Sequence, residues 1–571
     1  MSSIVGERDA WRPARVAVLV ALVMVAVVVF PRSAFAEPVV ADGIPGTNGA
    51  PVPVLEWGSC PAATPDEAEF LKDYQCTTAE VPLSYRDPQG PRITLALGRL
   101  PATDPEHRVG SLFWNPGGPG GSGRIPPEFS PKLHERFDIV GFDPRGVAES
   151  TPLQCFASNQ EALELFGWQF PITVTQEHSV IELTRRGTQR CAENGGPILQ
   201  HMATGNVARD LDLLRQAVGD EQLSYLGFSY GTQLGEVYAN LFPDRVRALT
   251  LDAVVDPVQW TTGRTPQEAS VPLFLRLGSH EGAYEALLAF LRACQDDVRC
   301  AFREAGRDLL AKYDTLLRRV RRRPVDIVVA GVGPVTVTYQ LAVILTLASL
   351  YDPSGSADLA AGLQDVYLAT EQRGQPTQPL KLDRLRALLR HRPALAAPAD
   401  EPYLGLEQGQ GVFCTDSDHA SDPWVWPQYA RAADRAAPYF GSRWAYASLP
   451  CATWPARDAD RYTGPWNRPT AHPVLLVGNR QGDPATPYAN AVSTARELAS
   501  ARLLTLNSYF GHGAFPESQC IVSAVERYVI DLELPPEGTV CQPDRKPFDP
   551  LPAPTRSRQQ LQEALTPPAA P

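Results

Sequence analysis

The sequence predicts an α/β fold with a mostly parallel sheet and a large, mainly helical insert, from three observations. Short apolar runs typical of buried parallel strands alternate with helix-like segments in the first half of the chain. The same alternation returns after residue 470. Between them, residues 258–470 carry mostly helical patterns. Strands that alternate with helices favour one open parallel sheet, so the central segment is expected to be inserted into it.

The pentapeptide Gly-Phe-Ser-Tyr-Gly at 227–231 follows a strand-like run at 223–226 and precedes a helix-like segment. Taken alone the motif is weak, because a serine that caps an ordinary helix also fits. The strand–turn–helix context is typical of the nucleophile elbow of an α/β-hydrolase. Glycines on both sides let strand and helix approach closely and permit a strained turn. The sequence therefore predicts Ser229 as a nucleophile in an α/β-hydrolase fold with a large helical lid insert.

A serine nucleophile needs a histidine base and a carboxylate that orients it, and in this fold the chain order is serine, acid, histidine. Asp483 lies on the loop after a buried strand predicted at 474–479. A helix at about 488–499 and a strand at 502–506 follow, and then comes His512 between two glycines. One helix and one strand return the chain to the same sheet edge. Of the nine histidines, only His512 combines this order, this edge and flanking glycines.

A glycine-rich segment at 115–123 follows a strand-like run at 111–114 and precedes another strand at 137–142. In a low-complexity region such a segment would be a flexible linker. Between two strands it fits the oxyanion loop of an α/β-hydrolase, with the amides of Gly118 and Tyr230 as donors. A phosphate-binding loop is excluded because no Gly-Lys-Ser/Thr follows.

Five motifs in fixed order resemble those of the secreted tripeptidyl aminopeptidases of the proline-iminopeptidase group. They are Pro-Gly-Gly-Pro-Gly at 116–120, Asp-Pro-Arg-Gly at 143–146, the pentapeptide at 227–231, Asp-Pro-Ala-Thr-Pro at 483–487 and Gly-His-Gly at 511–513. The resemblance extends to Cys-Ala-Thr-Trp-Pro at 451–455 and Gly-Thr-Val-Cys at 538–541. The chain departs from the pattern at Ala148 and Glu149, where a glycine and a small or basic residue are common. The acidic Glu149 bears on substrate preference at the rim of the site more than on catalysis.

The first residues predict export. Arg12 and Arg15 precede an apolar run at 16–30, and Ala-Phe-Ala at 34–36 is a small-residue cleavage signal. We interpret residues 1–36 as a signal peptide, with an uncleaved anchor that retains the protein in the cell envelope as the alternative. The net charge of −12 disfavours nucleic acid and anionic membranes as partners.

Ten cysteines in an exported chain indicate disulfides, although sequence does not fix their connectivity. Metal binding is disfavoured because no Cys-x-x-Cys or His-Glu-x-x-His spacing occurs. We expect bridges between neighbours along the chain: Cys60 with Cys76, Cys155 with Cys191, Cys294 with Cys300, Cys414 with Cys451, and Cys520 with Cys541.

The expected organisation has five parts. They are the signal peptide 1–36, the first part of the hydrolase core 37–257, the lid insert 258–470, the C-terminal part of the core 471–548 and a Pro-rich tail 549–571. An insert of this size can exclude water and select substrates.

The function predicted from these features is that of a secreted serine exopeptidase without metal or cofactor. It would release short peptides, tripeptides according to the resemblance, or single residues from free N-termini. A secreted carboxylesterase with the same triad and an inactive, hydrolase-like binding module are the alternatives. An aminopeptidase should hold the α-ammonium of its substrate with an acid of the insert. Asp416 is the first candidate, whereas Glu407 lies nearby and Asp418 fits a solvated or helix-capping role.

Overall fold

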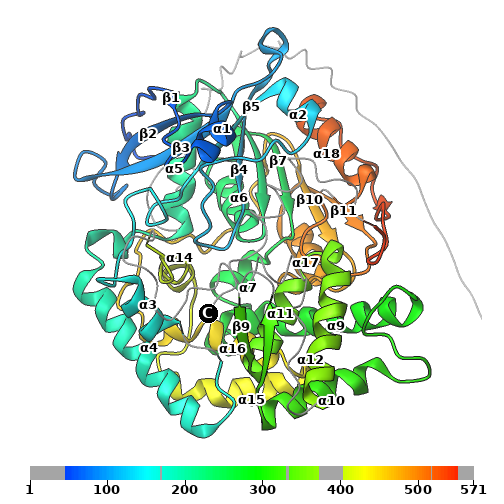
Figure 1. Ribbon diagram of the computed structural model, residues 1–571. Helices are drawn as coiled ribbons and strands as arrows, with labels where there is room; N and C mark the ends of the chain where they lie inside the picture. Colours follow the sequence, from blue (N-terminus) through cyan, green and yellow to red (C-terminus); the bar gives the residue numbers. More distant parts are fainter. Residues whose placement is uncertain (1–45, 168–169, 330–332, 372–402, 516, 551–571) are drawn as a thin grey trace, which may run out of the picture. The chain divides into compact units, whose positions relative to one another are not determined.

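The computed structural model describes residues 46–167, 170–329, 333–371, 403–515 and 517–550 (Figure 1). The predicted signal peptide and all but the first two residues of the predicted tail lie outside these ranges. No helix in the described ranges is both long enough and apolar enough to span a membrane.

A ten-stranded sheet has the order β1-β2-β3-β5-β4-β6-β7-β10-β11-β12. The pairs among β1, β2, β3 and β5 are antiparallel, and all the others are parallel. The strands are β1 (Gly58–Ser59), β2 (Gln75–Pro82), β3 (Arg92–Leu100), β4 (Gly110–Asn115), β5 (Phe137–Phe142), β6 (Leu223–Phe228), β7 (Val246–Asp252), β10 (Val474–Asn479), β11 (Ala501–Leu506) and β12 (Val540–Cys541). The parallel sheet predicted from the buried apolar runs is therefore confirmed.

Helices cover both faces of the sheet because its strands bury alternate residues on opposite sides. Tyr225 packs with α5 (Thr204–Ala217) and α6 (Tyr230–Leu241), whereas Leu226 packs with α18 (Gln519–Asp531). The other core helices are α1 (Pro65–Leu71), α2 (Pro131–Arg136), α3 (Asn159–Phe166), α4 (Val174–Asn194) and α17 (Tyr488–Glu497). Figure 1 shows α5 and α6 on one side of the sheet and α18 on the other.

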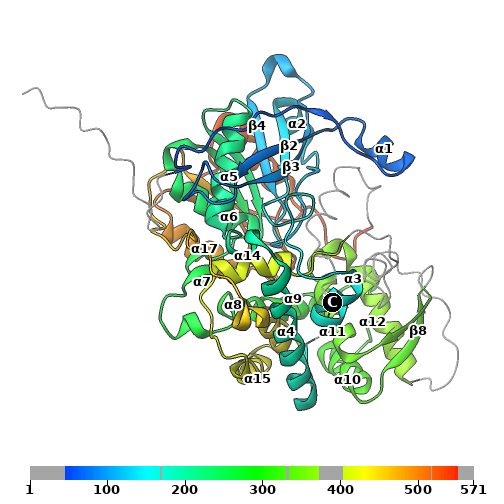
Figure 2. The same cartoon turned by 90° about the vertical axis from the view of Figure 1, so that its left-hand side faces the viewer.

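The insert leaves the sheet after β7 and returns at β10, its parallel neighbour. It has its own apolar core, which includes Phe290, Tyr313 and Trp426. Its helices are α7 (Pro257–Thr261), α8 (Leu273–Arg276), α9 (Ser279–Asp296), α10 (Leu309–Arg322), α11 (Tyr339–Ser349), α12 (Ser356–Glu371), α14 (Gln408–Asp416), α15 (Trp426–Ala436) and α16 (Gly441–Ala447). Figure 2 shows α7 and α14 at the boundary between the sheet and the other insert helices.

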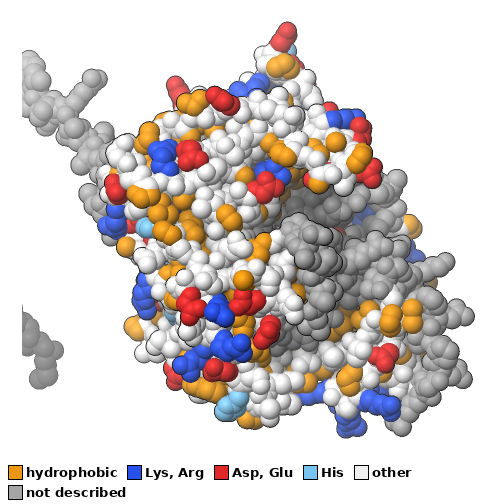
Figure 3. All heavy atoms as spheres, turned by 60° about the vertical axis from the view of Figure 1, so that its left-hand side comes forward, with side chains coloured by type: hydrophobic (Ala, Val, Ile, Leu, Met, Phe, Trp, Pro, Cys, Tyr) orange, Lys and Arg blue, Asp and Glu red, His pale blue; other side chains and the backbone are white. Residues whose placement is uncertain are grey.

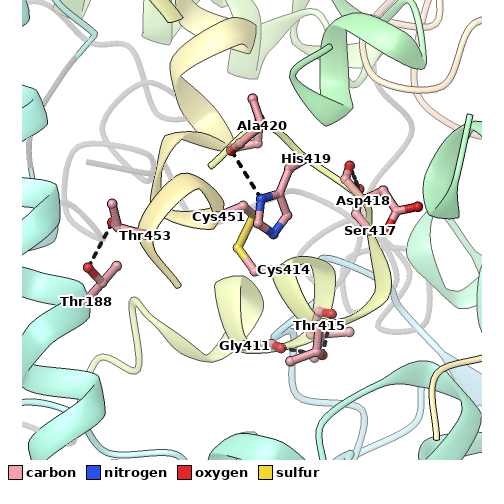
Figure 4. The surroundings of a disulfide bond; sticks show 12 residues. Thr188, Gly411, Cys414, Thr415, Ser417, Asp418, His419, Ala420, Cys451 and Thr453 are labelled. Atoms are coloured by element: carbon pink, nitrogen blue, oxygen red, sulfur yellow. Dashed lines mark hydrogen bonds between the residues drawn. A yellow bond between two sulfur atoms is a disulfide. The ribbon is translucent and has the colours of Figure 1, made fainter. Parts of the chain in front are cut away.

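Two features of the insert were not predicted. A short antiparallel hairpin, β8 (Val325–Val329) with β9 (Gly333–Val337), interrupts the helices. In addition, α4, which precedes β6 in the chain, contacts the insert through a hydrogen bond of 2.9 Å between Thr188 Oγ1 and Thr453 Oγ1 (Figure 4).

Five disulfides join the cysteines in the neighbouring pairs that the sequence suggests. The bond between Cys414 and Cys451 connects α14 to the short 3₁₀ segment η7 (Leu449–Thr453), as Figure 4 shows. Each bond closes a loop of 37 residues or fewer along the chain, so each constrains a local segment and contributes about 2–4 kcal/mol to the free energy of unfolding.

We expect peptide mapping of the unreduced protein to recover the five neighbouring pairs and no free thiol. The physical reason is that each pair is already within bonding distance in the folded chain. The reduced and alkylated sample provides the control. A bridge between distant cysteines such as Cys60 and Cys541, or free thiols at most positions, would contradict this pairing.

Candidate active site

Ser229 occupies the sharp turn between β6 and α6, with φ of 56° and ψ of −123°. A positive φ is costly for a residue other than glycine and persists only when the surroundings enforce it. Here the glycines of the motif allow the enforcing contacts. A Cβ on Gly227 would lie 2.4 Å from the carbonyl oxygen of Gly231, and one on Gly231 would lie 2.5 Å from that of Asn115. The turn leaves Ser229 partly exposed, as the sequence predicts.

The acid and the base meet at the ends of two neighbouring strands, β10 and β11. Nδ1 of His512 lies 2.9 Å from Oδ1 and 3.1 Å from Oδ2 of Asp483, whose side chain is 1% exposed. The amides of Ala485 and Thr486 donate to Oδ1 of Asp483 at 2.9 and 2.8 Å. These donors hold the carboxylate on its own loop, so its position does not depend on the histidine.

Asp252, the last residue of β7, connects the nucleophile turn to the histidine loop. Its carbonyl oxygen accepts the amide of Ser229 at 3.0 Å. Its carboxylate accepts the amides of Ala514, at 2.9 Å, and Phe515, at 2.8 Å. Burial raises the pKa of Asp252 to about 6, and these amide donors and His512 oppose the rise. Asp252 was not predicted from the sequence, although its place at the carboxyl end of a strand beside that of Asp483 was a usable signal.

The glycine-rich loop packs directly against the nucleophile turn. Gly117 and Gly118 have φ of 95° and 110°, which favour glycine. A Cβ on Gly117 would lie 2.8 Å from Cβ of Ser229 and 3.0 Å from the amide nitrogen of Tyr230. This close approach brings the loop that carries the Gly118 amide beside the Tyr230 amide, the two donors predicted for an oxyanion.

The Asp-Pro-Arg-Gly motif forms hydrogen bonds with this loop. Oδ1 of Asp143 accepts the Ser122 hydroxyl at 2.6 Å and the Gly123 amide at 3.1 Å. In addition, Glu149 forms an ion pair of 2.8 Å with Arg124. The unusual acidic residue is thus compensated by a neighbouring cation, and its side chain remains 60% exposed.

Asp416 lies at the end of α14, buried with 2% exposure. Its Oδ1 accepts the Thr204 amide at 2.8 Å, and its Oδ2 accepts the Thr204 hydroxyl at 2.5 Å and Nε1 of Trp260 at 3.0 Å. The Thr204 hydroxyl also lies 2.9 Å from the hydroxyl of Tyr230. Burial raises the pKa of Asp416. The carboxylate therefore joins the insert to the core behind the nucleophile.

The other two acids considered for the substrate amine differ from Asp416. Asp418 is partly exposed and forms an ion pair of 2.8 Å with Arg461. Glu407 is fully buried, and its Oε1 accepts the Cys155 amide and the Tyr403 hydroxyl. Its Oε2 accepts no hydrogen bond from the described part of the chain, and burial raises the pKa of this carboxyl.

One group of side chains in the described ranges has the composition of a metal site. His201, Asp458 and Asp460 place one potential ligand atom each within 4.8 Å of one another. Nε of Arg86 already lies 2.5 Å from Asp460, and Asp458 accepts the Ala203 amide at 2.9 Å. Groups of the protein therefore already contact both carboxylates. On the face in Figure 3, acidic and basic side chains are interspersed, without a broad basic area for a polyanion.

A strained serine between strand and helix, an Asp–His pair on adjacent strand ends and a glycine loop beside the serine define the serine hydrolases of the α/β-hydrolase fold. The family model for the alpha/beta hydrolase fold matches residues 111–277, and the model described as TAP-like protein matches 437–541. The chain belongs to the family of the tripeptidyl aminopeptidases, the TAP-like proteins, as the resemblance implies.

Three relatives in this family span most of the chain. Tripeptidyl aminopeptidase of Streptomyces lividans is 30% identical over 86% of this chain and 87% of its own. Serine protease Hip1 of Mycobacterium tuberculosis is 31% identical over 85% and 91%. Carboxylesterase B of the same species is 30% identical over 87% and 92%. Among solved structures, esterase E22 aligns with 80% of this chain and 99% of its own, at 11% identity and a TM-score of 0.34.

We expect Asp252→Asn to lower kcat/KM by about tenfold to a hundredfold. A neutral amide oxygen is a weaker acceptor than a carboxylate, and the amide NH2 group would replace one of the two oxygens that face the Ala514 amide, so the histidine loop would shift. The substrate is a neutral ester such as p-nitrophenyl acetate. The matched control is Asp244→Asn, at an exposed acid just before β7, and its kcat/KM should equal that of wild type.

The pH dependence separates this role from a purely structural one. The pKa of Asp252 is raised from 3.8 to about 6. The folded chain therefore binds this proton more tightly than the unfolded chain does, and the contribution of Asp252 to the free energy of unfolding falls as pH rises between about 4 and 6. Activity should change in the opposite direction, because the ionised carboxylate accepts the two amides more strongly than the protonated carboxyl does. The acid limb of the pH profile of kcat/KM in wild type then contains the ionisation of Asp252, which Asp252→Asn lacks. Limbs of equal steepness would contradict the prediction.

Proposed function

We propose that the protein is a secreted serine exopeptidase that releases short peptides, tripeptides first of all, or single residues from free N-termini. The observation that carries the chemistry is the pair of His512 and Asp483, 2.9 Å apart, tied through Asp252 to the strained turn of Ser229. The family relatives named as peptidases support the choice of a peptide substrate.

The proposed mechanism is acyl transfer in two steps. Ser229 attacks the scissile carbonyl while His512 takes its proton, and the same proton then goes to the departing amine. Because Nδ1 of His512 faces Asp483, the other ring nitrogen is left for the serine. The amides of Gly118 and Tyr230 stabilise the oxyanion. Water then hydrolyses the acyl-enzyme. This sequence of steps uses no metal or cofactor.

The proposed location outside the cell rests on the cysteines. All ten are paired, and disulfides persist in oxidising compartments. Cleavage after residue 36 would release the protein, whereas an uncleaved N-terminal segment would retain it in the cell envelope. We further propose that the insert acts as a lid that limits substrate length and excludes water.

Recognition of the α-ammonium is proposed for an acid of the insert, with Asp416 as the first candidate. Its three hydrogen bonds favour an anchoring role, so the substrate ammonium would have to bind this carboxylate in addition to the three donors already present. Glu407 is the second candidate, because one of its buried oxygens is without a donor. Asp416→Asn and Glu407→Gln, compared on free and acetylated peptides, distinguish the two.

A carboxylesterase is the second candidate function, favoured by the 30% identity to a relative of that name. It would use the same nucleophile, base and oxyanion donors, since the triad does not specify the acyl group.

Ser229→Ala should abolish turnover of esters and peptides while Tm stays within a few degrees of wild type, because the residue is partly exposed on the turn and is not part of the core. His512→Ala should do the same, and Asp483→Asn should retain a small fraction of the rate through the wrong tautomer. A covalent fluorophosphonate adduct, found by mass spectrometry on wild type and absent from Ser229→Ala, completes the test. Wild-type rates in purified Ser229→Ala would refute the assignment.

Acetylation of a peptide substrate tests the exopeptidase. It removes the ammonium and leaves a desolvated carboxylate unpaired, which should lower kcat/KM by about a hundredfold or more. Free and acetylated mono-, di- and tripeptides with the same fluorogenic leaving group are compared. Their kcat/KM values measure the effect of acetylation and show how many residues are released per cleavage. Similar rates for both forms would replace this function with an esterase or an endopeptidase.

A further inference from the structure

Tyr351, a residue of the insert, contacts His512 through both its backbone and its ring. Its carbonyl oxygen accepts the His512 amide at 2.8 Å. Its ring packs against the imidazole in an edge-to-face arrangement, with ring centroids 4.9 Å apart and an angle of 66° between the planes. Beside it, Pro353 packs on Gly511, where an added Cβ would lie 2.9 Å from Cδ of the proline. The insert therefore forms one wall around the proposed base.

The turn that carries Tyr351 is held in place by the insert itself. The preceding helix α11 is apolar on all sides, and its residues 340–349 are buried, as expected of a helix surrounded by a protein core. Just beyond Tyr351, the side chain of Asp352 accepts the Ser354 amide at 2.7 Å. Pro353 follows Asp352 and begins the 3₁₀ segment η5 (Pro353–Gly355), where its ring restricts the backbone. The position of Tyr351 thus does not depend on the histidine.

The loop that carries His512 needs such support from outside. The histidine stands between two glycines with φ of 126° and 87°, and glycine leaves a backbone more conformational freedom than any other residue does. Core residues restrain part of the loop, because Nδ2 of Asn479 donates to the Gly511 carbonyl at 2.9 Å and Asp483 bonds Nδ1 of the imidazole. A hydrogen bond at one nitrogen still lets the imidazole tilt about that atom. The packed ring of Tyr351 opposes this tilt.

We propose that Tyr351 is a positioning residue for the base. Its carbonyl and its ring hold His512 in the orientation in which Nδ1 bonds Asp483 and Nε2 is left for Ser229. General acid–base catalysis requires the working nitrogen to lie within hydrogen-bond reach of the group it serves, and a displacement of about 1 Å can cost a hundredfold in rate. The insert is then more than a lid, because the catalytic centre is complete only when the insert is docked on the core. The inference rests on the proposed base, though not on the identity of the acyl group.

The test compares two acetate esters that differ in how much their leaving groups need a proton. p-Nitrophenolate departs readily as an anion, whereas the more basic p-methoxyphenolate departs with the help of a proton from His512. Both esters form the same acetyl-enzyme, so kcat/KM differs only through this step. Tyr351→Leu keeps the carbonyl and the apolar character but removes the ring. We expect kcat/KM to fall by about tenfold to a hundredfold for p-nitrophenyl acetate, and by about threefold more for p-methoxyphenyl acetate.

Three further variants complete the comparison. Tyr351→Phe keeps the ring and should stay within about twofold of wild type on both esters. Tyr351→Met is a second variant without the ring, in case the leucine variant does not fold. Trp424→Leu is the matched control, because Trp424 is an exposed aromatic residue of the insert that packs on a different histidine, His178, with ring centroids 4.7 Å apart. Rates are normalised to the active sites counted by the fluorophosphonate adduct, and Tm is measured for every variant.

The possible outcomes separate this inference from the proposed function. Equal losses for the two esters in Tyr351→Leu and Tyr351→Met would show a structural role only and overturn the proposal. Wild-type rates in these variants, or a loss in Tyr351→Phe as large as in Tyr351→Leu, would overturn it too. Wild-type turnover in His512→Ala would refute the base itself, and the positioning role with it. Cleavage of the esters but of no peptide would refute the exopeptidase and leave the positioning role in place.

Discussion

The geometry of the active site depends on one buried carboxylate, that of Asp252. Its backbone fixes the amide of Ser229 and its side chain fixes two amides just beyond His512. These groups come from distant parts of the chain and converge because β7 lies between β6 and β10 in the sheet. The same hydrogen bonds make it possible to bury the carboxylate at all, since a desolvated charge needs donors. One residue thus contributes to the position of both the nucleophile and the base.

The insert is joined to the same machinery from the opposite side. α14 contacts the glycine-rich loop at its start, where a Cβ on Gly409 would lie 2.5 Å from the carbonyl of Pro119. At its end, Asp416 reaches Tyr230 through Thr204. A substitution in the insert can therefore shift both expected oxyanion donors without contacting the substrate. The nucleophile turn and the insert are structurally coupled.

Features that depend on local sequence could be predicted, whereas those that depend on distant contacts could not. The apolar runs of β6 and β10, the glycines around Ser229 and the sheet edge shared by Asp483 and His512 follow from periodicity and steric demand. The amides that the Asp252 carboxylate accepts lie 262 and 263 residues away along the chain, so no local pattern indicates them. The anchoring contacts of Asp416 depend on the packing of the insert for the same reason. The β8–β9 hairpin was missed because its short segments follow a strongly helical pattern.

The disulfides have a consequence for how the protein matures. Each cysteine is bonded to the next one along the chain, from Cys60–Cys76 to Cys520–Cys541, and no bond encloses another cysteine. A chain that enters an oxidising compartment with its N-terminus first presents the two members of each pair in succession, before the following pair arrives. Oxidation in order of arrival therefore yields the native set, and the protein should mature with little need for a disulfide isomerase.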